Sequence, residues 1–87
     1  MAIDYAKLRS LRARSLIRAL KQDGFALRKS DNRRGGVVHL YAHPDGRSTT
    51  LHLHHLGQTF KVGTLKSIIE RQIGWDEHDL KRLKLIK

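Results

Sequence analysis

The chain of 87 residues has room for one domain with a modest hydrophobic core, because a fold of this size leaves much of its surface in water. It carries 18 Lys and Arg residues against 8 Asp and Glu residues, for a formal net charge of +10. A small soluble domain usually carries a net charge of about 2 to 8, so the excess favours a polyanionic partner over a merely solubilising surface. We expect nucleic acid, RNA rather than DNA, since Lys and Arg release counterions condensed on phosphates.

Other classes of protein are disfavoured by composition. The apolar runs are only a few residues long, and no stretch has the lipid-facing stripe of an interfacial anchor, so we expect no membrane partner. The absence of Cys excludes a disulfide framework and a thiolate zinc site. Residues 1–5 lack the pattern of a signal peptide, so a cytoplasmic location is expected.

A basic amphipathic helix is predicted over residues 10–23. Its apolar side chains recur near helical spacing, at Leu11, Leu16, Ile17 and Leu20. Arg and Lys side chains fill the outer face. Gly24 is expected to end the helix in a left-handed conformation, and residues 25–29 to follow as a short strand.

A hairpin of two strands is predicted next. Residues 31–36 form a polar connection, and residues 37–43 then alternate as a strand does. The tetrapeptide at residues 43–46 predicts a β-turn, because Pro44 presets φ at the second position and Gly46 suits the fourth. Residues 47–54 are again extended, so the two strands should pair antiparallel.

Two helices are predicted to complete the chain. Thr64 is placed to cap a helix that continues through Ile73 and ends at Gly74. Asp76 is placed to cap a short last helix that ends near residue 83. The order of helix, three strands and two helices predicts one α+β domain over residues 1–87, with a three-stranded antiparallel sheet covered by helices on one face.

Side-chain alternation predicts which face of the hairpin the helices cover. Leu51 and Leu53 share one face of the last strand. Val38, Leu40 and Ala42 share one face of the preceding strand, and we expect both sets to meet the helices. The opposite, open face would then carry polar and aromatic side chains: His39, Tyr41, His43, Thr50, His52 and His54. A slip of the register by one residue would exchange the faces.

Four of the six histidines lie on that predicted open face. Such a cluster suggests two functions, metal binding or proton transfer. A metal site is disfavoured, because no Cys or helical His-Glu-x-x-His motif is present and strand residues four apart lie roughly 13 Å apart. Proton transfer suits the basic surroundings better, since RNA cleavage by its own 2′-hydroxyl needs a base, an acid and cations. The alternative is that these are solvated strand residues. We expect no metal and no cofactor.

Three short motifs carry a resemblance to a known family. They are Asp23-Gly24-Phe25 after the basic helix, His43-Pro44-Asp45-Gly46-Arg47 at the hairpin, and Gly63-Thr64-Leu65-Lys66-Ser67-Ile68-Ile69-Glu70 in the next helix. Their order and spacing resemble the HicA, or YcfA-like, family of type II toxin-antitoxin toxins. The resemblance covers most of the chain and implies a double-stranded-RNA-binding-like fold, mRNA interferase (endoribonuclease) activity without a metal, and a HicB-type antitoxin protein as partner.

The resemblance also implies site residues. The family's second strand usually opens with Gly-Ser-His or Gly-Gly-His, whose histidine is catalytic, and here Gly36-Val37-Val38 stands in that place. Val38 cannot transfer a proton, and some members carry the histidine one place later, so His39 is implied as the general acid/base. His54 matches the histidine that follows the family's third strand and is given a supporting role.

Further residues are expected to hold RNA or to complete the family motif. The expected RNA-binding side chains are Arg28, Arg33, Arg34, Tyr41, Arg47 and Lys61. The motif positions are Gly36, His43 and Gly46.

Two other functions remain open. The loss of histidine at Val38 motivates an RNA-binding module without catalysis, or a degenerate family member. A DNA-binding helix-turn-helix over residues 64–83 is disfavoured, because Asp76, Glu77 and Asp79 would meet phosphates of like sign. An RNA-recognition motif stacks bases on several strand aromatics, whereas Tyr41 is the only aromatic on the predicted open face.

Overall fold

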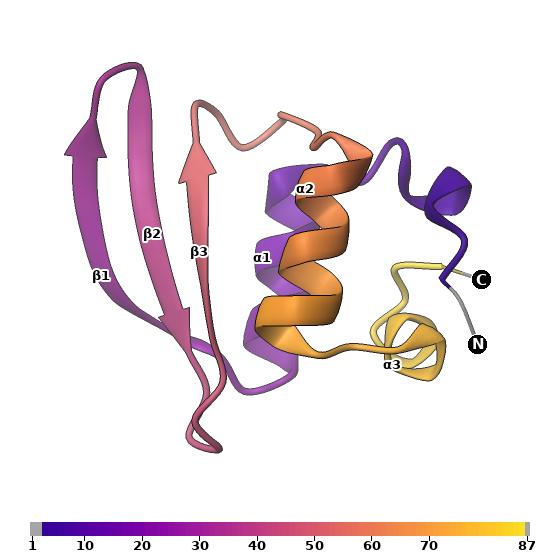
Figure 1. The fold of residues 1–87 in the computed structure, drawn as a ribbon. Coiled ribbons are helices and arrows are strands. Elements are labelled where there is room, and N and C mark those ends of the chain that lie inside the picture. Colours follow the sequence, from indigo (N-terminus) through magenta and orange to yellow (C-terminus); the bar gives the residue numbers. More distant parts are fainter. Residues whose placement is uncertain (1–2, 87) are drawn as a thin grey trace.

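The structure is a computed structural model that describes residues 3–86 (Figure 1). In chain order the elements are η1 (Tyr5–Leu8), α1 (Ala13–Gln22), β1 (Ala26–Arg33), β2 (Gly36–Ala42), β3 (Ser48–Leu53), α2 (Val62–Lys66), η2 (Ser67–Ile73) and α3 (Glu77–Arg82). η1 is a 3-10 turn, and η2 continues α2 as a π-helical stretch. The predicted α+β layout is therefore confirmed, with η1 as an additional short element.

The three strands form one antiparallel sheet in the order β1-β2-β3, which confirms the predicted hairpin. The β2–β3 turn is closed by a hydrogen bond from Gly46 N–H to the carbonyl of His43, at 3.0 Å. Gly46 has a φ of +100°, a conformation that favours glycine. The β1–β2 turn lies at the opposite end of the sheet from the β2–β3 turn (Figure 1).

Two helix boundaries follow local sequence signals, and one does not. Gly74 ends η2 in a left-handed conformation, with φ at +78°. Asp76 begins α3 in a capping box with Asp79, in which each side chain accepts the other's backbone N–H. The predicted cap at Thr64 is wrong: α2 begins two residues earlier, with Lys61 as the residue before it and no side-chain cap.

β1 is longer than predicted. The sequence predicts a strand over residues 25–29 and a polar connection over residues 31–36, but β1 continues to Arg33. Asp31 and Asn32 pair with residues of β2, so the strand is held by the hydrogen-bonded ladder and not by burial. The second half of this strand is polar and shows no alternation of apolar residues, so the sequence pattern did not predict it.

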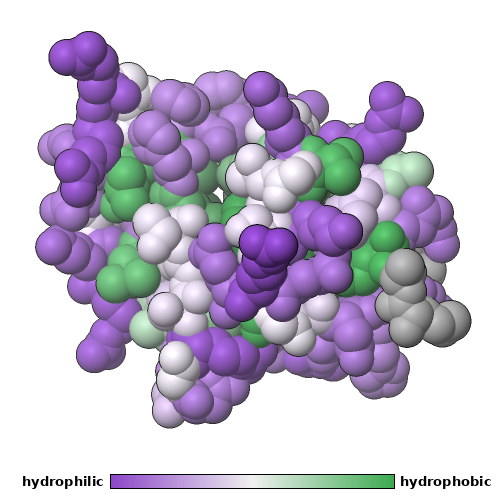
Figure 2. Space-filling view, viewed as in Figure 1, coloured by the Kyte–Doolittle hydropathy of each residue, from purple (hydrophilic) through white to green (hydrophobic). Residues whose placement is uncertain are grey.

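One hydrophobic core joins the helices to one face of the sheet. Its buried side chains include Leu16 and Leu20 of α1, Leu51 and Leu53 of β3, Ile69 and Ile73 of η2, and Leu80 of α3. The face of the molecule shown in Figure 2 is mostly hydrophilic, with small apolar patches. No helix within residues 3–86 is long and apolar enough to cross a membrane.

The predicted faces are confirmed for β3 and wrong for β2. Tyr41 is only 3% exposed and so lies in the core, and His39 pairs with the buried Leu51 on the helix side of the sheet. Val38 turns to the open face instead. The turn at residues 43–46 sets this register, and β2 bears apolar side chains on both faces, so its alternation alone favoured the wrong set.

Candidate functional site

An open hollow of about 180 Å³ lies beside the end of β3 and the start of β2. Its lining residues are Val37, His39, Leu53, His54, His55 and Leu56. It brings His39 and His54, the two predicted catalytic residues, to one opening together with His55. We call these six residues the histidine hollow.

His39 is half-buried on β2, with polar and aromatic neighbours. The hydroxyl oxygen of Ser30 lies 3.2 Å from its Nδ1. The ring of Tyr41 stacks beside it, with ring centroids 6.2 Å apart and planes 20° apart. Since a hydroxyl can donate or accept, Ser30 can hold the His39 ring in either tautomer, and Nε2 is left for a substrate.

His54 is exposed directly after β3 and is bound at two points. Its Nδ1 donates to the carbonyl of Gly35 in the β1–β2 turn, and its backbone N–H donates to Gln58 Oε1 at 2.6 Å. A carbonyl oxygen can only accept, so the proton of the neutral ring is on Nδ1. Nε2 therefore carries the lone pair that a general base needs.

Gly36 makes room for these imidazoles. A Cβ at this position would lie 2.5 Å from the carbonyl oxygen of Leu53, 3.1 Å from His52 Nε2 and 3.2 Å from His54 Nδ1. The rings of His52 and His54 are themselves 4.8 Å apart. The glycine of the family motif is thus required by a close approach between β2 and the end of β3.

Two arginines that the sequence analysis did not assign to the site lie next to the hollow. A Cβ on Gly57 would lie 3.4 Å from Arg12 Nη1, 3.5 Å from Arg14 Nη2 and 3.5 Å from His55 Nδ1, so the three side chains surround this glycine. Arg12 also donates to the Gly57 carbonyl at 2.9 Å. These groups provide positive charge beside the histidines.

Backbone contacts hold the start of α1 against the loop after β3. The N–H of Ala13 donates to the carbonyl of Gln58 at 2.8 Å, and the N–H of Arg14 donates to the carbonyl of Leu56 at 3.0 Å. These bonds satisfy N–H groups that have no partner within the helix. Residues 12–14 and 55–58 meet only in the folded chain, so no local signal could have assigned these arginines to the site.

The predicted RNA-binding side chains are divided between the two ends of the sheet. Arg33 ends β1 and Arg34 follows in the turn that holds His54, and both are exposed. Lys61 is exposed just before α2. Arg28 stands at a β-bulge nearer the opposite end, beside a hollow that His43 also lines.

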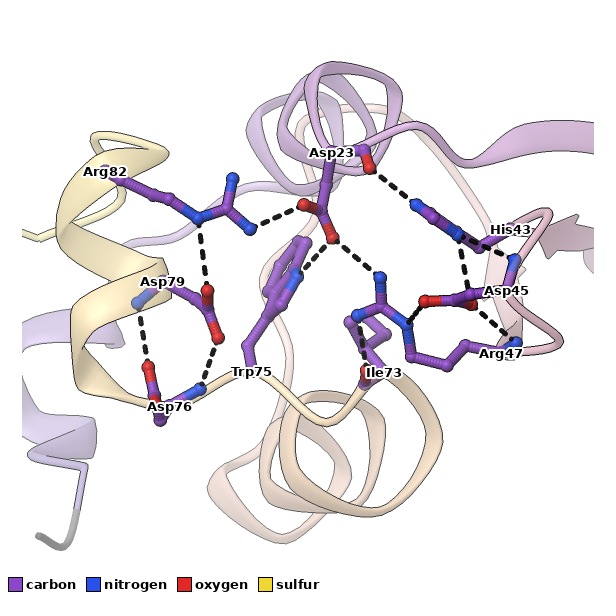
Figure 3. Close-up of polar contacts among 9 residues, drawn as sticks. All are labelled: Asp23, His43, Asp45, Arg47, Ile73, Trp75, Asp76, Asp79 and Arg82. Carbon is purple, nitrogen blue, oxygen red and sulfur yellow. Dashed lines mark hydrogen bonds and ion pairs between the residues drawn. The ribbon is translucent and has the colours of Figure 1, made fainter.

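A buried carboxylate, Asp23, organises that opposite end (Figure 3). Its side chain is 8% exposed and accepts hydrogen bonds from Trp75 Nε1 at 2.9 Å, Arg82 at 2.5 Å and Arg47 at 3.4 Å. Burial raises the pKa of Asp23, but the hydrogen bonds from Trp75 and Arg82 and the charges of Arg82 and Arg47 outweigh it and lower that pKa below its usual value.

His43 and Arg47 belong to this Asp23 cluster (Figure 3). His43 Nε2 donates to the backbone carbonyl of Asp23 at 2.8 Å, and its ring packs edge-on against Phe25 at 5.1 Å. Arg47 binds Asp45 at 2.7 Å and the carbonyl of Ile73 at 2.9 Å. His43 is therefore packed into the framework and not on the predicted open face.

These contacts change the set of candidate RNA ligands. Tyr41 is buried in the core, so its predicted place on the open face of the sheet is wrong. Arg47 is engaged by Asp23 and Asp45 inside the protein. Within residues 3–86, no three His, Asp or Glu side chains are grouped in a way that could hold a metal ion.

Comparison with known proteins identifies the family. A family model described as the HicA toxin of bacterial toxin-antitoxin matches residues 13–75, from the start of α1 to the Trp75 of the Asp23 cluster. No curated protein and no solved structure matches the chain. Because the family model spans well over half of the chain and includes the whole sheet and the histidine hollow, this protein belongs to the HicA family of toxins of bacterial toxin-antitoxin systems.

Proposed function

We propose that this protein is a cytoplasmic toxin that cleaves mRNA as a metal-independent endoribonuclease and is neutralised by a HicB-type antitoxin. The observation that carries the proposal is the histidine hollow, where His39 and His54 share one opening. Membership of the HicA family supports a toxin with an antitoxin partner.

The proposed reaction uses the RNA's own 2′-hydroxyl as nucleophile. One imidazole removes the proton of that hydroxyl, and the 2′-oxygen attacks the adjacent phosphorus. The bond from phosphorus to the 5′-oxygen breaks, and a protonated imidazole gives its proton to that leaving oxygen. We assign proton transfer to His39 and the supporting role to His54, whose Nε2 has the lone pair of a base.

The basic side chains around the hollow would hold the RNA backbone. Arg12 and Arg14 lie beside His55, and Arg33 and Arg34 lie at the turn that binds His54. Their charges would stabilise the extra negative charge on the phosphate as the 2′-oxygen attacks. Lys61 would contact RNA that continues toward α2, and Arg28 would contact RNA that continues along β1.

The test is an RNA cleavage assay in EDTA at neutral pH and low salt, read as new 5′ ends. The wild type is expected to cut a mixed RNA, and His39→Ala is expected to bind the same RNA without cutting it. Cleavage that needs an added divalent ion would overturn the metal-independent reaction. Cleavage that survives His39→Ala would overturn the assignment of His39.

The second candidate function is RNA binding without catalysis. It is favoured by Val38, which stands where the family usually has its catalytic histidine and turns to the open face, away from the hollow. If the wild type and His39→Ala both bind RNA and neither cuts any RNA at high protein concentration, this second function is the correct one.

A further inference from the structure

The two edge strands of the sheet differ in how their outer backbone groups are bonded. On β3, side-chain amides occupy some of these groups. Gln72 Oε1 accepts the backbone N–H of Thr50 at 3.1 Å. Gln58 donates through Nε2 to the carbonyl of His52 at 3.2 Å and accepts the N–H of His54 at 2.6 Å. These two amides occupy backbone groups that a neighbouring strand would otherwise bind, so β3 is protected from pairing with another chain.

The edge of β1 has no such protection within the described residues. β1 is the longest strand of the sheet, with eight residues, and seven of them are exposed on the surface. Among residues 3–86, the hydrogen bonds of its backbone run to β2 alone. A row of unpaired N–H and C=O groups is a template for a further strand.

The charge of this edge determines what kind of strand it can accept. Arg28, Lys29, Arg33 and Arg34 lie along β1 and its turn, whereas Asp31 is the one acidic residue there and is paired with Lys29 at 3.6 Å. A second copy of β1 would bring the same excess of basic side chains to this edge, and like charges on paired strands are destabilising. An acidic strand would be attracted instead.

We propose that the free edge of β1 binds an extended, acidic segment of a partner protein, which joins the sheet as a fourth strand. Backbone hydrogen bonds would supply a register-defined attachment, and acidic side chains would select the basic edge. Leu27, which is 46% exposed, offers an apolar contact for one side chain of the added strand. The added strand would also neutralise Arg33 beside the histidine hollow.

A designed peptide tests this directly. The probe is a capped nine-residue peptide that alternates Glu and Val, and its control has Lys in place of every Glu. We expect the acidic peptide to slow amide hydrogen exchange at alternate residues of β1 by tenfold or more, with β3 unchanged, and the Lys peptide to do nothing. The proposal is overturned if the acidic peptide fails to bind, or binds without protecting β1 amides.

Charge-reversal variants separate the edge from the protein's overall charge. Lys29→Glu with Arg33→Glu reverses two charges on β1, and Lys66→Glu with Arg71→Glu makes the same change on α2 and η2, where both side chains are also exposed. We expect about tenfold weaker peptide binding for the β1 pair and a smaller loss for the helix pair. Equal losses would mean nonspecific attraction. Peptide binding is independent of RNA cleavage, so either proposal can fail alone.

Discussion

The ring of His54 is held through its Nδ1 by the backbone carbonyl of Gly35, so a side chain that follows β3 is oriented by the turn between β1 and β2. The same bond sets the tautomer, because the carbonyl requires a proton on Nδ1. A histidine held in this way presents its basic nitrogen in a defined direction even though the residue itself is exposed. This pre-orientation distinguishes His54 from a solvated surface histidine.

Replacing His54 tests its proposed supporting role. His54→Ala is expected to lower the rate of RNA cleavage by less than the roughly 10² to 10⁴ that a general acid or base contributes, because its role is a supporting one, while RNA binding measured by filter retention changes little. His52→Ala is the matched control, because its ring lies 4.8 Å away but does not line the histidine hollow. Equal losses in the two variants would contradict the role given to His54.

Replacing Gly36 tests the close approach of β2 to the end of β3. Gly36→Ala would place a methyl group 2.5 Å from a backbone oxygen of Leu53, which cannot rotate away as a side chain can. We expect a loss of about 1 to 3 kcal/mol in the free energy of unfolding, seen as a lower melting temperature. Gly63→Ala is the control, because nothing lies within 4 Å of its Cβ position. An unchanged melting temperature for Gly36→Ala would show that the strand end can move.

Neutralising Asp23 tests the buried cluster. Asp23→Asn retains an acceptor for Trp75 but removes the charge that binds Arg47 and Arg82. We expect the free energy of unfolding in urea to fall by about 1.5 to 3 kcal/mol, the usual worth of a hydrogen bond to a charged group. Asp31→Asn serves as the control, because that carboxylate is 42% exposed and, among residues 3–86, pairs only with Lys29. Similar losses for both variants would argue against a special role for Asp23.

The lowered pKa of Asp23 also predicts acid sensitivity. In the unfolded chain its pKa is about 3.9, and in the folded chain it is lower, so the unfolded state takes up the proton first as the pH falls. The stabilisation from Asp23 is therefore complete at pH values above the unfolded-state pKa, and it is lost as the pH drops below about 4. Urea midpoints measured down this pH range should fall more steeply for the wild type than for Asp23→Asn. Parallel curves would contradict the prediction.

Replacing Arg14 tests whether the arginines beside the histidine hollow contact RNA. Arg14→Ala is expected to weaken RNA binding and to reduce the slope of log affinity against log salt by about 1, because one phosphate contact is lost. Lys81→Ala is the control, since Lys81 pairs with Glu77 on α3 away from the hollow. An unchanged salt slope for Arg14→Ala would mean that Arg14 does not contact phosphate.

Local chemistry was sufficient to predict the glycines that end helices or form the hairpin turn, and the cap of the last helix. Gly24, Gly46 and Gly74 all adopt the positive φ that their positions after helices or in a turn indicate. Asp76 caps α3 as predicted, because capping depends on residues only three apart. Turns and caps of this kind depend on residues that are close in the sequence, so the local sequence is enough to predict them.

Long-range features were harder to predict. The facing of His39 depends on how β2 and β3 are aligned, and one strand's alternation does not contain that information when both of its faces carry apolar residues. The length of β1 depends on pairing with β2, because its polar side chains give no periodic signal. Arg12 and Arg14 reach the site only because the start of α1 packs against the loop after β3.

The Asp23 cluster lies at the β2–β3 turn and the histidine hollow lies beside the end of β3, next to the β1–β2 turn. These two turns stand at opposite ends of the sheet (Figure 1), and this separation affects how the protein can evolve. Most of the polar contacts that anchor the helices to the hairpin are far from the hollow. A substitution in the first residues of β2 therefore leaves these contacts in place. Val38 illustrates this tolerance, because it faces outward and displaces none of the contacts of Asp23. The chemistry of such a domain can therefore change over generations faster than its shape does.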